Sequence, residues 1–236
     1  MSQSELAGTV DEFLAIVSHE LRTPLTAIKG CARTLLRHGT TLEPAVAHQL
    51  LEDIDQEAER LHRLVENLLE LSRAGQGTPV LRVAPTAIDG LIRRVVADVT
   101  PKAGERRFRL KLAAGLPLPR IDAVQVEQVV RNLLDNAVKY SPRRGTIDVG
   151  AAQVAHAIVV TVSDDGPGVA PELGERIFER FFHVEPPDMN VGGAGLGLAI
   201  CRRFIELHGG TIELEPARAR GASFRFTLPL VAEIPP

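Results

Sequence analysis

The stretch Ser18-His19-Glu20-Leu21-Arg22-Thr23-Pro24-Leu25 lies in a run whose apolar residues recur every three or four positions, the period of an α-helix. It places an imidazole beside a carboxylate, with a hydroxyl one helical turn further on. A neutral imidazole nitrogen is a good nucleophile near pH 7, so His19 is a candidate phosphoryl acceptor. Glu20 can take up the proton that His19 loses, and Thr23 can orient a water molecule for the reverse hydrolysis.

On a helical wheel His19 and the apolar stripe point in opposite directions. At about 100° per residue the stripe fills an arc of roughly 120°, whereas His19 falls about 240° from the first apolar residue and about 40° from Thr23. His19 is therefore predicted to face away from the core, as a reactive group or as an ordinary surface histidine. Pro24 removes a backbone hydrogen bond, which predicts a bend. The stripe comprises Phe13, Val17, Leu21, Pro24, Leu25, Ile28, Cys31 and Leu35.

The surrounding residues, from about Glu5 to Ala74, are predicted to form two amphipathic helices. The break between them contains Gly39 and Pro44, which are typical of a helix end and of the next helix start. A single helical hairpin buries two apolar stripes poorly. Either a second copy completes a dimeric four-helix bundle, or the hairpin packs on the downstream domain of its own chain.

A linker signal, Gly75-Gln76-Gly77-Thr78-Pro79, separates the hairpin from a mixed α/β pattern. We therefore predict a helical domain over residues 1–74, a linker over 75–80 and an α/β domain over 81–236. In that domain we expect helices near 91–99 and 124–139, and a third helix that the glycine-rich stretch Gly192–Ile200 opens and that runs to Leu207. Strands are expected at 108–112, 146–149 and 157–162, with a final hairpin of 211–214 and 224–228 across Gly221.

Composition excludes several classes of protein. The chain has 236 residues, 44% of them hydrophobic, and a formal net charge of −3, which gives no argument for binding nucleic acid or an anionic membrane. Its two cysteines, Cys31 and Cys201, fit no metal spacing and are expected in the core, which suits a reducing cytoplasm. No apolar stretch approaches the roughly 20 residues of a membrane span, and the N-terminus does not resemble a signal peptide. The remaining histidines are expected at the surface: His38, His48, His62, His156, His183 and His208.

Two motifs in the α/β region offer groups for a nucleotide and its metal. Asn132 and Asn136 lie four residues apart on a predicted helix, so they share a face, and amide oxygens are suitable ligands for Mg²⁺. Lys139 can reach a phosphate, and Tyr140 can stack on a base. A polar helix face without a ligand would have the same pattern.

Two glycine-rich turns complete this pattern. Asp164 follows a buried strand and can accept a hydrogen bond from an adenine amino group, while Gly166 and Gly168 let the backbone approach a ligand. A plain acidic turn is the alternative. The second turn opens a helix, whose unpaired N–H groups attract phosphates, unless it is a glycine loop without function. Its candidate binding residues are Gly193, Gly195, Leu196 and Gly197.

These motifs, in this order, resemble those of the bacterial two-component sensor histidine kinases. Ser18–Leu25 is similar to the phosphoacceptor box of that family. The family also has N, G1, F and G2 boxes. In that order, they are similar to Asn132–Tyr140, Asp164–Gly168, Ile177–Phe182 and Gly193–Leu198 of this chain. The resemblance runs from about Phe13 to Leu230. It implies a dimeric histidine-phosphotransfer hairpin followed by an ATP-binding α/β sandwich of the Bergerat type.

The resemblance also implies roles for single residues. His19 corresponds to the phosphorylated histidine, Glu20 to its acid/base neighbour, and Glu20 with Thr23 to the pair that supports phosphatase activity. Asn136 corresponds to the Mg²⁺ ligand, with Asn132 beside it. Lys139, Tyr140 and Asp164 correspond to the phosphate contact, the base-stacking residue and the acid that reads adenine. The implied partners are a second copy of the chain and a response regulator with a receiver domain.

Two departures from the family pattern bear on function. Residues 183–191, expected to form a lid over the nucleotide, contain Glu185 and Asp188 but no lysine or arginine, so a cationic lid contact to the γ-phosphate is not expected. This favours weak ATP binding and keeps open an alternative, a non-catalytic dimeric phosphotransfer or scaffold protein. The sequence also contains no input domain, so it is either an excised catalytic core or a kinase that receives its signal from a separate sensor protein.

Overall fold

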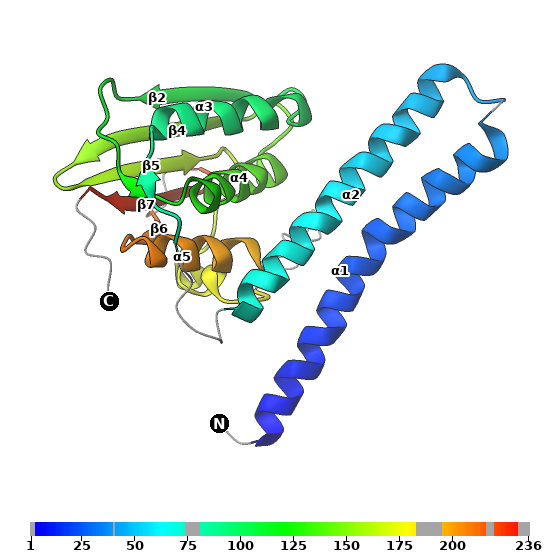
Figure 1. Cartoon of the computed structure of the whole chain (residues 1–236), viewed down its shortest axis with the longest axis horizontal. Coiled ribbons are helices and arrows are strands. Elements are labelled where there is room, and N and C mark those ends of the chain that lie inside the picture. The colour runs from blue at the N-terminus through cyan, green and yellow to red at the C-terminus, as the bar shows by residue number, and fades with distance from the viewer. Residues whose placement is uncertain (1–2, 40, 74–80, 183–194, 216–219, 231–236) are drawn as a thin grey trace. The chain divides into compact units, whose positions relative to one another are not determined.

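The computed structural model describes residues 3–39, 41–73, 81–182, 195–215 and 220–230 (Figure 1). They form two compact units, a helical unit within residues 3–73 and an α/β unit that starts at residue 81. Within some helical stretches only the backbone is described, and the side chains of His19 and Glu20 are among those left out. In the described ranges no helix has the length and apolar character needed to cross a membrane.

The first unit is a pair of antiparallel helices, α1 (Gln3–His38) and α2 (Pro44–Arg73). Main-chain hydrogen bonds close the end of α1: the N–H of Gly39 donates to the oxygen of Leu35 at 2.8 Å, and that of Leu42 to His38 at 2.9 Å. Pro44 begins α2, where a missing N–H removes no helical hydrogen bond. The predicted helices and break are confirmed. Helix α1 continues through Pro24 and bends along its length (Figure 1).

The apolar faces of this unit are only partly covered within one chain. Pro24 is buried and most other described members of the predicted stripe are half-buried. Leu25 is 56% exposed within one chain. Leu25 lies at the edge of the predicted arc, where a single neighbouring helix does not cover it. Among the described residues of this unit, the exposed large apolar side chains are Leu25, Leu36, Val46, Leu51, Val65 and Leu69.

The second unit contains a five-stranded sheet in the order β2-β4-β5-β7-β6. Strand β2 (Arg107–Leu112) runs parallel to β4 (Thr146–Val154), and the remaining pairs are antiparallel. The other three strands are β5 (Ala157–Ser163), β6 (Ile212–Leu214) and β7 (Ser223–Pro229). A separate two-stranded ribbon pairs β1 (Ala84–Pro85) with β3 (Arg120–Ile121).

A layer of three helices packs against the sheet (Figure 1). Helix α4 (Ala123–Tyr140) lies between α3 (Ile88–Val99) and α5 (Gly197–Leu207). Short 3₁₀ turns occur at η1 (Thr100–Lys102), η2 (Pro171–Leu173) and η3 (Arg176–Phe178). The predicted α/β sandwich is confirmed.

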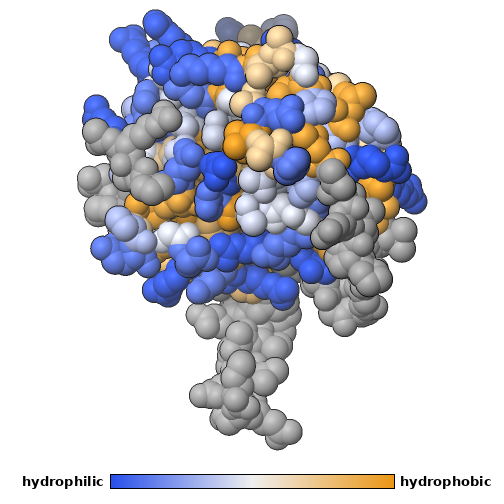
Figure 2. Space-filling model, turned by 90° about the vertical axis from the view of Figure 1, so that its left-hand side faces the viewer, coloured by the Kyte–Doolittle hydropathy of each residue, from blue (hydrophilic) through white to orange (hydrophobic). Residues whose placement is uncertain are grey.

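Alternation along the strands gives the sheet one apolar face and one polar face. The apolar face packs on the helices, and its buried residues are Ile147, Val149, Ala151, Ile158, Val160, Val162, Phe224, Phe226 and Leu228. The polar face presents Asp148, Ser163 and Ser223 at neighbouring positions of β4, β5 and β7. On the side of the α/β unit seen in Figure 2, hydrophilic and apolar residues are interspersed.

Most element boundaries lie within one residue of those predicted, and those of α3 and β4 differ by more. Helix α3 begins at Ile88 rather than near residue 91, because Ile88 lies one turn before Leu91 and is fully buried with it. Strand β4 extends to Val154 since it pairs with β5 from Asp148 to Val154, although its last three residues are exposed and lack an apolar pattern. Strand β6 is shorter, beginning at Ile212.

The cysteine prediction is confirmed for only one of the two residues. Cys201 is fully buried, and burial raises the pKa of its thiol to about 12. Cys31 is half-buried, because it lies on the partly covered face of α1.

Candidate active site

The phosphoacceptor box lies on α1, in the first unit. Ser18 and Thr23 are exposed, and Pro24 is buried, which agrees with the orientation predicted by the helical wheel. The side chains of His19 and Glu20 fall outside the described part, so their orientation stays a prediction. The backbone at both positions is helical.

Helix α4 carries the predicted amide and phosphate-binding residues on one side. Asn132, Asn136, Lys139 and Tyr140 are all half-buried, while the opposite side of the helix is packed in the core. The amide nitrogen of Asn132 donates to the main-chain oxygen of Gly197 at 3.4 Å, which links α4 to the first residue of α5. The ammonium nitrogen of Lys139 lies 4.8 Å from the ring centroid of Tyr140, a cation–π contact.

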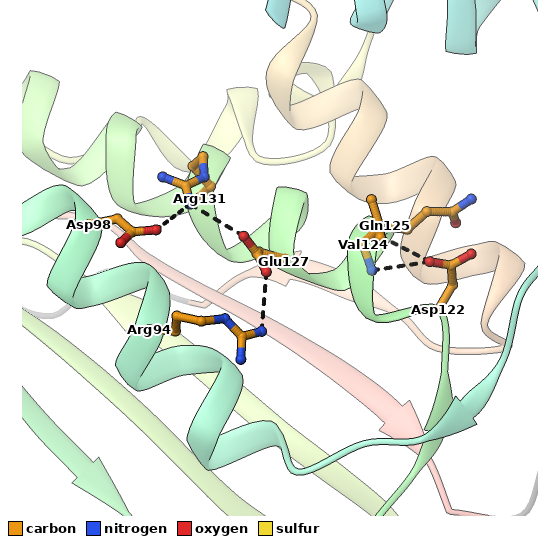
Figure 3. A network of polar contacts seen from close by, with 7 residues as sticks. All are labelled: Arg94, Asp98, Asp122, Val124, Gln125, Glu127 and Arg131. Carbon is orange, nitrogen blue, oxygen red and sulfur yellow. Dashed lines mark hydrogen bonds and ion pairs between the residues drawn. The ribbon is translucent and has the colours of Figure 1, made fainter.

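Two sets of polar contacts hold α4 in place (Figure 3). At its start, Asp122 Oδ1 accepts hydrogen bonds from the N–H groups of Val124 at 3.1 Å and Gln125 at 3.4 Å, as an N-cap does. Further along, Arg131 contacts Asp98 of α3 at 2.9 Å. Glu127 of α4 contacts Arg94 of α3 at 3.3 Å. These charges tie α4 to α3 on the side away from Asn132.

His208 was predicted to be an ordinary surface histidine, and that is wrong in part. It is half-buried, its Nδ1 lies 2.7 Å from the oxygen of Phe204, and its Nε2 accepts the N–H of Asp122 at 2.9 Å. It therefore joins the end of α5 to the start of α4. The fold brings these positions together over 86 residues of sequence, which no local pattern indicates. His38, His48, His62 and His156 are exposed as expected, and His183 lies outside the described residues.

Asp164 directly follows β5 and is only 9% exposed. Its Oδ1 accepts two backbone hydrogen bonds, from Gly166 at 2.7 Å and from Ala222 at 3.4 Å, and its own N–H donates to the oxygen of Ala222 at 2.9 Å. Burial is the largest influence and raises the pKa of the Asp164 carboxyl, to which the nearby charge of Asp165 adds. The two backbone N–H groups act in the opposite direction.

Close backbone contacts explain the glycine of the first turn. A Cβ at Gly166 would lie 2.6 Å from Asp164 Oδ1 and 2.8 Å from the oxygen of Tyr140. Only glycine therefore lets the end of α4 at Tyr140 and the turn after β5 at Asp164 approach each other at this point.

The second turn joins the F-box segment to α5. Gly195 has φ +63°, and its carbonyl accepts the N–H of Phe181 at 3.0 Å. A Cβ at Gly195 would lie 2.6 Å from the carbonyl carbon of Phe181. Leu196 is 2% exposed, so its side chain belongs to the core and only its backbone remains a candidate nucleotide contact. Gly193 and the predicted lid over 183–191 lie outside the described residues.

Arg202 of α5 is a residue that the sequence reasoning missed. Its guanidinium lies 4.2 Å from the ring centroid of Phe178 and 2.9 Å from Glu175, so it holds η3 against α5. No motif distinguishes this arginine from other polar residues on the helix. In the described ranges no three His, Cys, Asp or Glu side chains form a cluster that could hold a metal ion.

Comparison with known proteins identifies both units. Residues 9–77 match the family of the His Kinase A (phospho-acceptor) domain, and residues 121–232 match the family of histidine kinase-, DNA gyrase B- and HSP90-like ATPases. The chain is 34% identical over 225 residues to the adaptive-response sensory kinase SasA of Synechococcus sp. (strain JA-3-3Ab), covering 93% of this chain and 59% of that protein.

Two solved structures resemble the chain along most of its length. Full-length ShkA in complex with AMPPNP has a TM-score of 0.66 and 31% identity, over 94% of this chain and 46% of that one. Histidine kinase ThkA in complex with the response regulator protein TrrA has a TM-score of 0.67 and 28% identity, over 97% and 64%.

The first curated relatives are longer than this chain, which spans 24% to 59% of their length. What is shared is the order of the two units, a phosphoacceptor hairpin and then an ATPase domain, with the predicted motifs inside the matched ranges. The chain therefore belongs to the sensor histidine kinases, and its two units are the phosphoacceptor and ATPase domains of that family's catalytic core.

Proposed function

We propose that this chain is an ATP-dependent protein-histidine kinase that phosphorylates its own His19 and passes the phosphoryl group to an aspartate of a response regulator. The observation that carries the proposal is the presence, on one chain, of a phosphoacceptor box on α1 and a buried carboxylate, Asp164, at a glycine-rich turn beside α4. The domain boundaries that we propose are 1–74 and 81–236, with a linker over 75–80; the two compact units support them.

Asp164 is the proposed reader of the adenine base. Both backbone hydrogen bonds to its carboxylate end on Oδ1, so Oδ2 is the oxygen left to accept the amino group of adenine. Tyr140, whose carbonyl lies against Gly166, is the proposed stacking surface. The solved complex of ShkA with AMPPNP supports a nucleotide of this class.

The triphosphate is proposed to lie along α4 and the start of α5. Helix α5 has no side-chain cap at Leu196, so its first N–H groups remain candidates for phosphate oxygens. Glycines 166, 168, 193, 195 and 197 allow a close approach of the backbone. Lys139, which contacts the ring of Tyr140, is the proposed cation for the phosphates.

The residues on α4 fit a Mg²⁺ ion brought in by the nucleotide. Asn132 uses its amide nitrogen to bind Gly197, which leaves its amide oxygen as a hard neutral donor one turn from Asn136. Bound Mg²⁺ would neutralise charge on the phosphate oxygens. Asn136 is the proposed ligand, and Asn132 lies beside it.

In the proposed reaction a nitrogen of His19 attacks the γ-phosphorus of ATP. The N–P bond forms as the bond from the γ-phosphorus to the bridging oxygen breaks, ADP leaves, and the proton of the imidazole passes to Glu20. The remaining residues position the nucleotide and balance its charge, which is the main source of catalysis in phosphoryl transfer. Glu20 and Thr23 are also proposed to support hydrolysis of the phosphoryl group on the response regulator, which is a phosphatase activity.

The proposed assembly is a homodimer formed by two hairpins. The exposed apolar side chains of α1 and α2, Leu25 and Leu51 among them, support a second copy that covers them. The complex of ThkA with TrrA supports a response regulator as partner. We propose a cytoplasmic location, with input from either a separate sensor protein or a further part of the same polypeptide.

To test the proposal, the wild type and a His19→Ala variant are each incubated with γ-labelled ATP and Mg²⁺. Acid-labile, base-stable label on the wild type alone is the expected result and identifies kinase and acceptor together. Folded, dimeric protein that binds ADP but takes no label would instead favour a scaffold. Equal label on the variant would overturn His19 as the acceptor.

A further inference from the structure

A hydrogen-bonded chain of two hydroxyls and one carboxylate lies next to Asp164. Ser163, the last residue of β5, has its Oγ 2.8 Å from the Oγ of Ser223, the first residue of β7. The hydroxyl of Ser223 donates to Glu215 Oε2 at 2.6 Å. Glu215 follows β6 directly, and its N–H donates to the oxygen of Ser223 at 2.8 Å.

The bond from Ser223 to Glu215 determines the direction of these hydrogen bonds. Ser223 donates to Glu215 Oε2 and so uses its single proton there. The lone pairs of Ser223 then accept the proton of Ser163. Ser223 is 6% exposed, which makes each of these bonds stronger than it would be in water and leaves a buried polar group unpaired when one is removed.

The same two strand ends hold Asp164. Ser163 and Ser223 are register partners on β5 and β7. The residues next to them, Asp164 and Ala222, are joined by a main-chain hydrogen bond and by a bond to the Asp164 side chain. The carbonyl of Asp164 lies so close to Gly221 that a Cβ there would be 1.7 Å away. A shift of the start of β7 relative to β5 would therefore change the direction of the Asp164 carboxylate.

The hydroxyl chain is on the polar face of the sheet, and its role is not core packing. The flanking residues Val162 and Phe224 point to the opposite face and are buried. A polar cavity of about 60 Å³ lies beside the chain and is lined in part by Asp148, Ser163 and Ser223. Loss of a hydroxyl here creates no new apolar void.

We propose that Glu215, Ser223 and Ser163 are positioning residues for base recognition, which hold the end of β5 in the register that aims Asp164 Oδ2 at the adenine amino group. This inference rests on the proposed function, because it assigns to Asp164 the reading of the base. It assigns to these three residues a role that acts through Asp164 and not through a contact of their own with the nucleotide.

The test compares the Ser223→Ala variant with a matched control on the same strand. Thr227 of β7 also makes a cross-strand hydroxyl pair, with Thr211 at 3.1 Å, and it lies four residues further from Asp164. Thr227→Val removes that pair, together with the bond that Thr227 Oγ1 accepts from the N–H of Thr211 at 2.9 Å. Ser223→Thr keeps the hydroxyl, and Ser223 lines a cavity of about 60 Å³. Glu215→Ala removes the acceptor without changing either serine.

The measurements are the dissociation constants of ADP and GDP for the full chain, by calorimetry, with the melting temperature of each variant. Ser223→Ala and Glu215→Ala are expected to weaken ADP by about tenfold, which corresponds to about 1.4 kcal/mol, and to leave GDP unchanged. A merely destabilised protein would lose both nucleotides in parallel. Ser223→Thr is expected to restore the ADP preference, and Thr227→Val to retain it.

Three outcomes separate the two levels of the proposal. A wild type that does not prefer ADP overturns the base-reading role of Asp164, and with it this part of the proposed function. A wild-type preference that survives both Ser223→Ala and Glu215→Ala overturns the positioning role alone. If Ser223→Ala does not fold, the Glu215→Ala variant decides the question in the same way.

Discussion

Replacing Asp164 by asparagine should separate nucleotide recognition from stability. In the wild type Oδ1 accepts the N–H groups of Gly166 and Ala222, and an asparagine oxygen can keep both bonds. The amide nitrogen must then take the position of Oδ2. A hydrogen-bond donor would face the amino group of adenine, which is also a donor.

The expected loss of affinity follows from this exchange. A hydrogen bond to a charged group contributes about 1.5–3 kcal/mol, so Asp164→Asn should weaken ADP by roughly 10- to 150-fold. Binding of GDP, which has an acceptor oxygen at the same ring position, should weaken less or improve. Calorimetry with both nucleotides measures the two changes.

The same substitution should not lower the stability of the folded protein. Burial raises the pKa of Asp164 in the folded protein, so the folded state binds its proton more tightly than the unfolded state does. The ionised form therefore destabilises the folded protein at pH values above the raised pKa, and this effect disappears as the pH falls below the ordinary pKa of about 3.9. At neutral pH the melting temperature of Asp164→Asn should equal or exceed that of the wild type.

Asp165→Asn is the matched control, because it removes the same charge from an exposed neighbour. It should change ADP affinity by no more than about twofold, as surface substitutions do. Unchanged ADP and GDP affinities in Asp164→Asn would refute the assignment of adenine reading. A clear drop in its melting temperature would refute the account of the two Oδ1 hydrogen bonds.

Two further variants test the metal site and the second turn. Asn136→Ala should abolish autophosphorylation while its melting curve stays close to that of the wild type, because the side chain is half-buried and lies outside the core face of α4; label retained in this variant would contradict the metal assignment. Gly195→Ala should destabilise the protein by at least about 1–2 kcal/mol in urea unfolding, since the position combines φ +63° with a Cβ 2.6 Å from the Phe181 backbone. Gly90→Ala on α3, where a Cβ meets nothing closer than 3.9 Å, is the control and should stabilise by up to about 1 kcal/mol; equal effects of the two glycine variants would show that the close contact is not what requires glycine.

The spacing of apolar residues predicted the helices and strands and their order, because an element that is buried on one face has apolar residues at regular intervals in the sequence. The pattern around Leu91 and Leu133 predicted the helices that carry the core, and alternation in 108–112 predicted the edge strand β2. It failed at the ends of elements. The exposed tail of β4 pairs by main-chain hydrogen bonds alone, and such bonds are not encoded by side-chain type.

The motifs by themselves named the candidate site residues. Asn132, Asn136 and Asp164 were proposed from residue type and spacing, since ligation and hydrogen bonding require particular functional groups. Helix geometry also predicted that the phosphoacceptor face points away from the core; Thr23 on that face is exposed as expected, and the orientation of His19 stays a prediction. How completely one hairpin covers its apolar stripe did not follow from the sequence, and Leu25 is 56% exposed within one chain.

Only the tertiary structure decided how the site residues are held. The contacts from Ala222 to Asp164, from Gly197 to Asn132 and from Gly195 to Phe181 join positions that are 58, 65 and 14 residues apart, respectively. Such contacts depend on which strands and helices become neighbours, and that choice is made by the whole core rather than by any local stretch. The chemical type of each candidate residue can therefore be read from the sequence. The hydrogen bonds that orient each side chain form only when β5, β7, α4 and α5 are packed together.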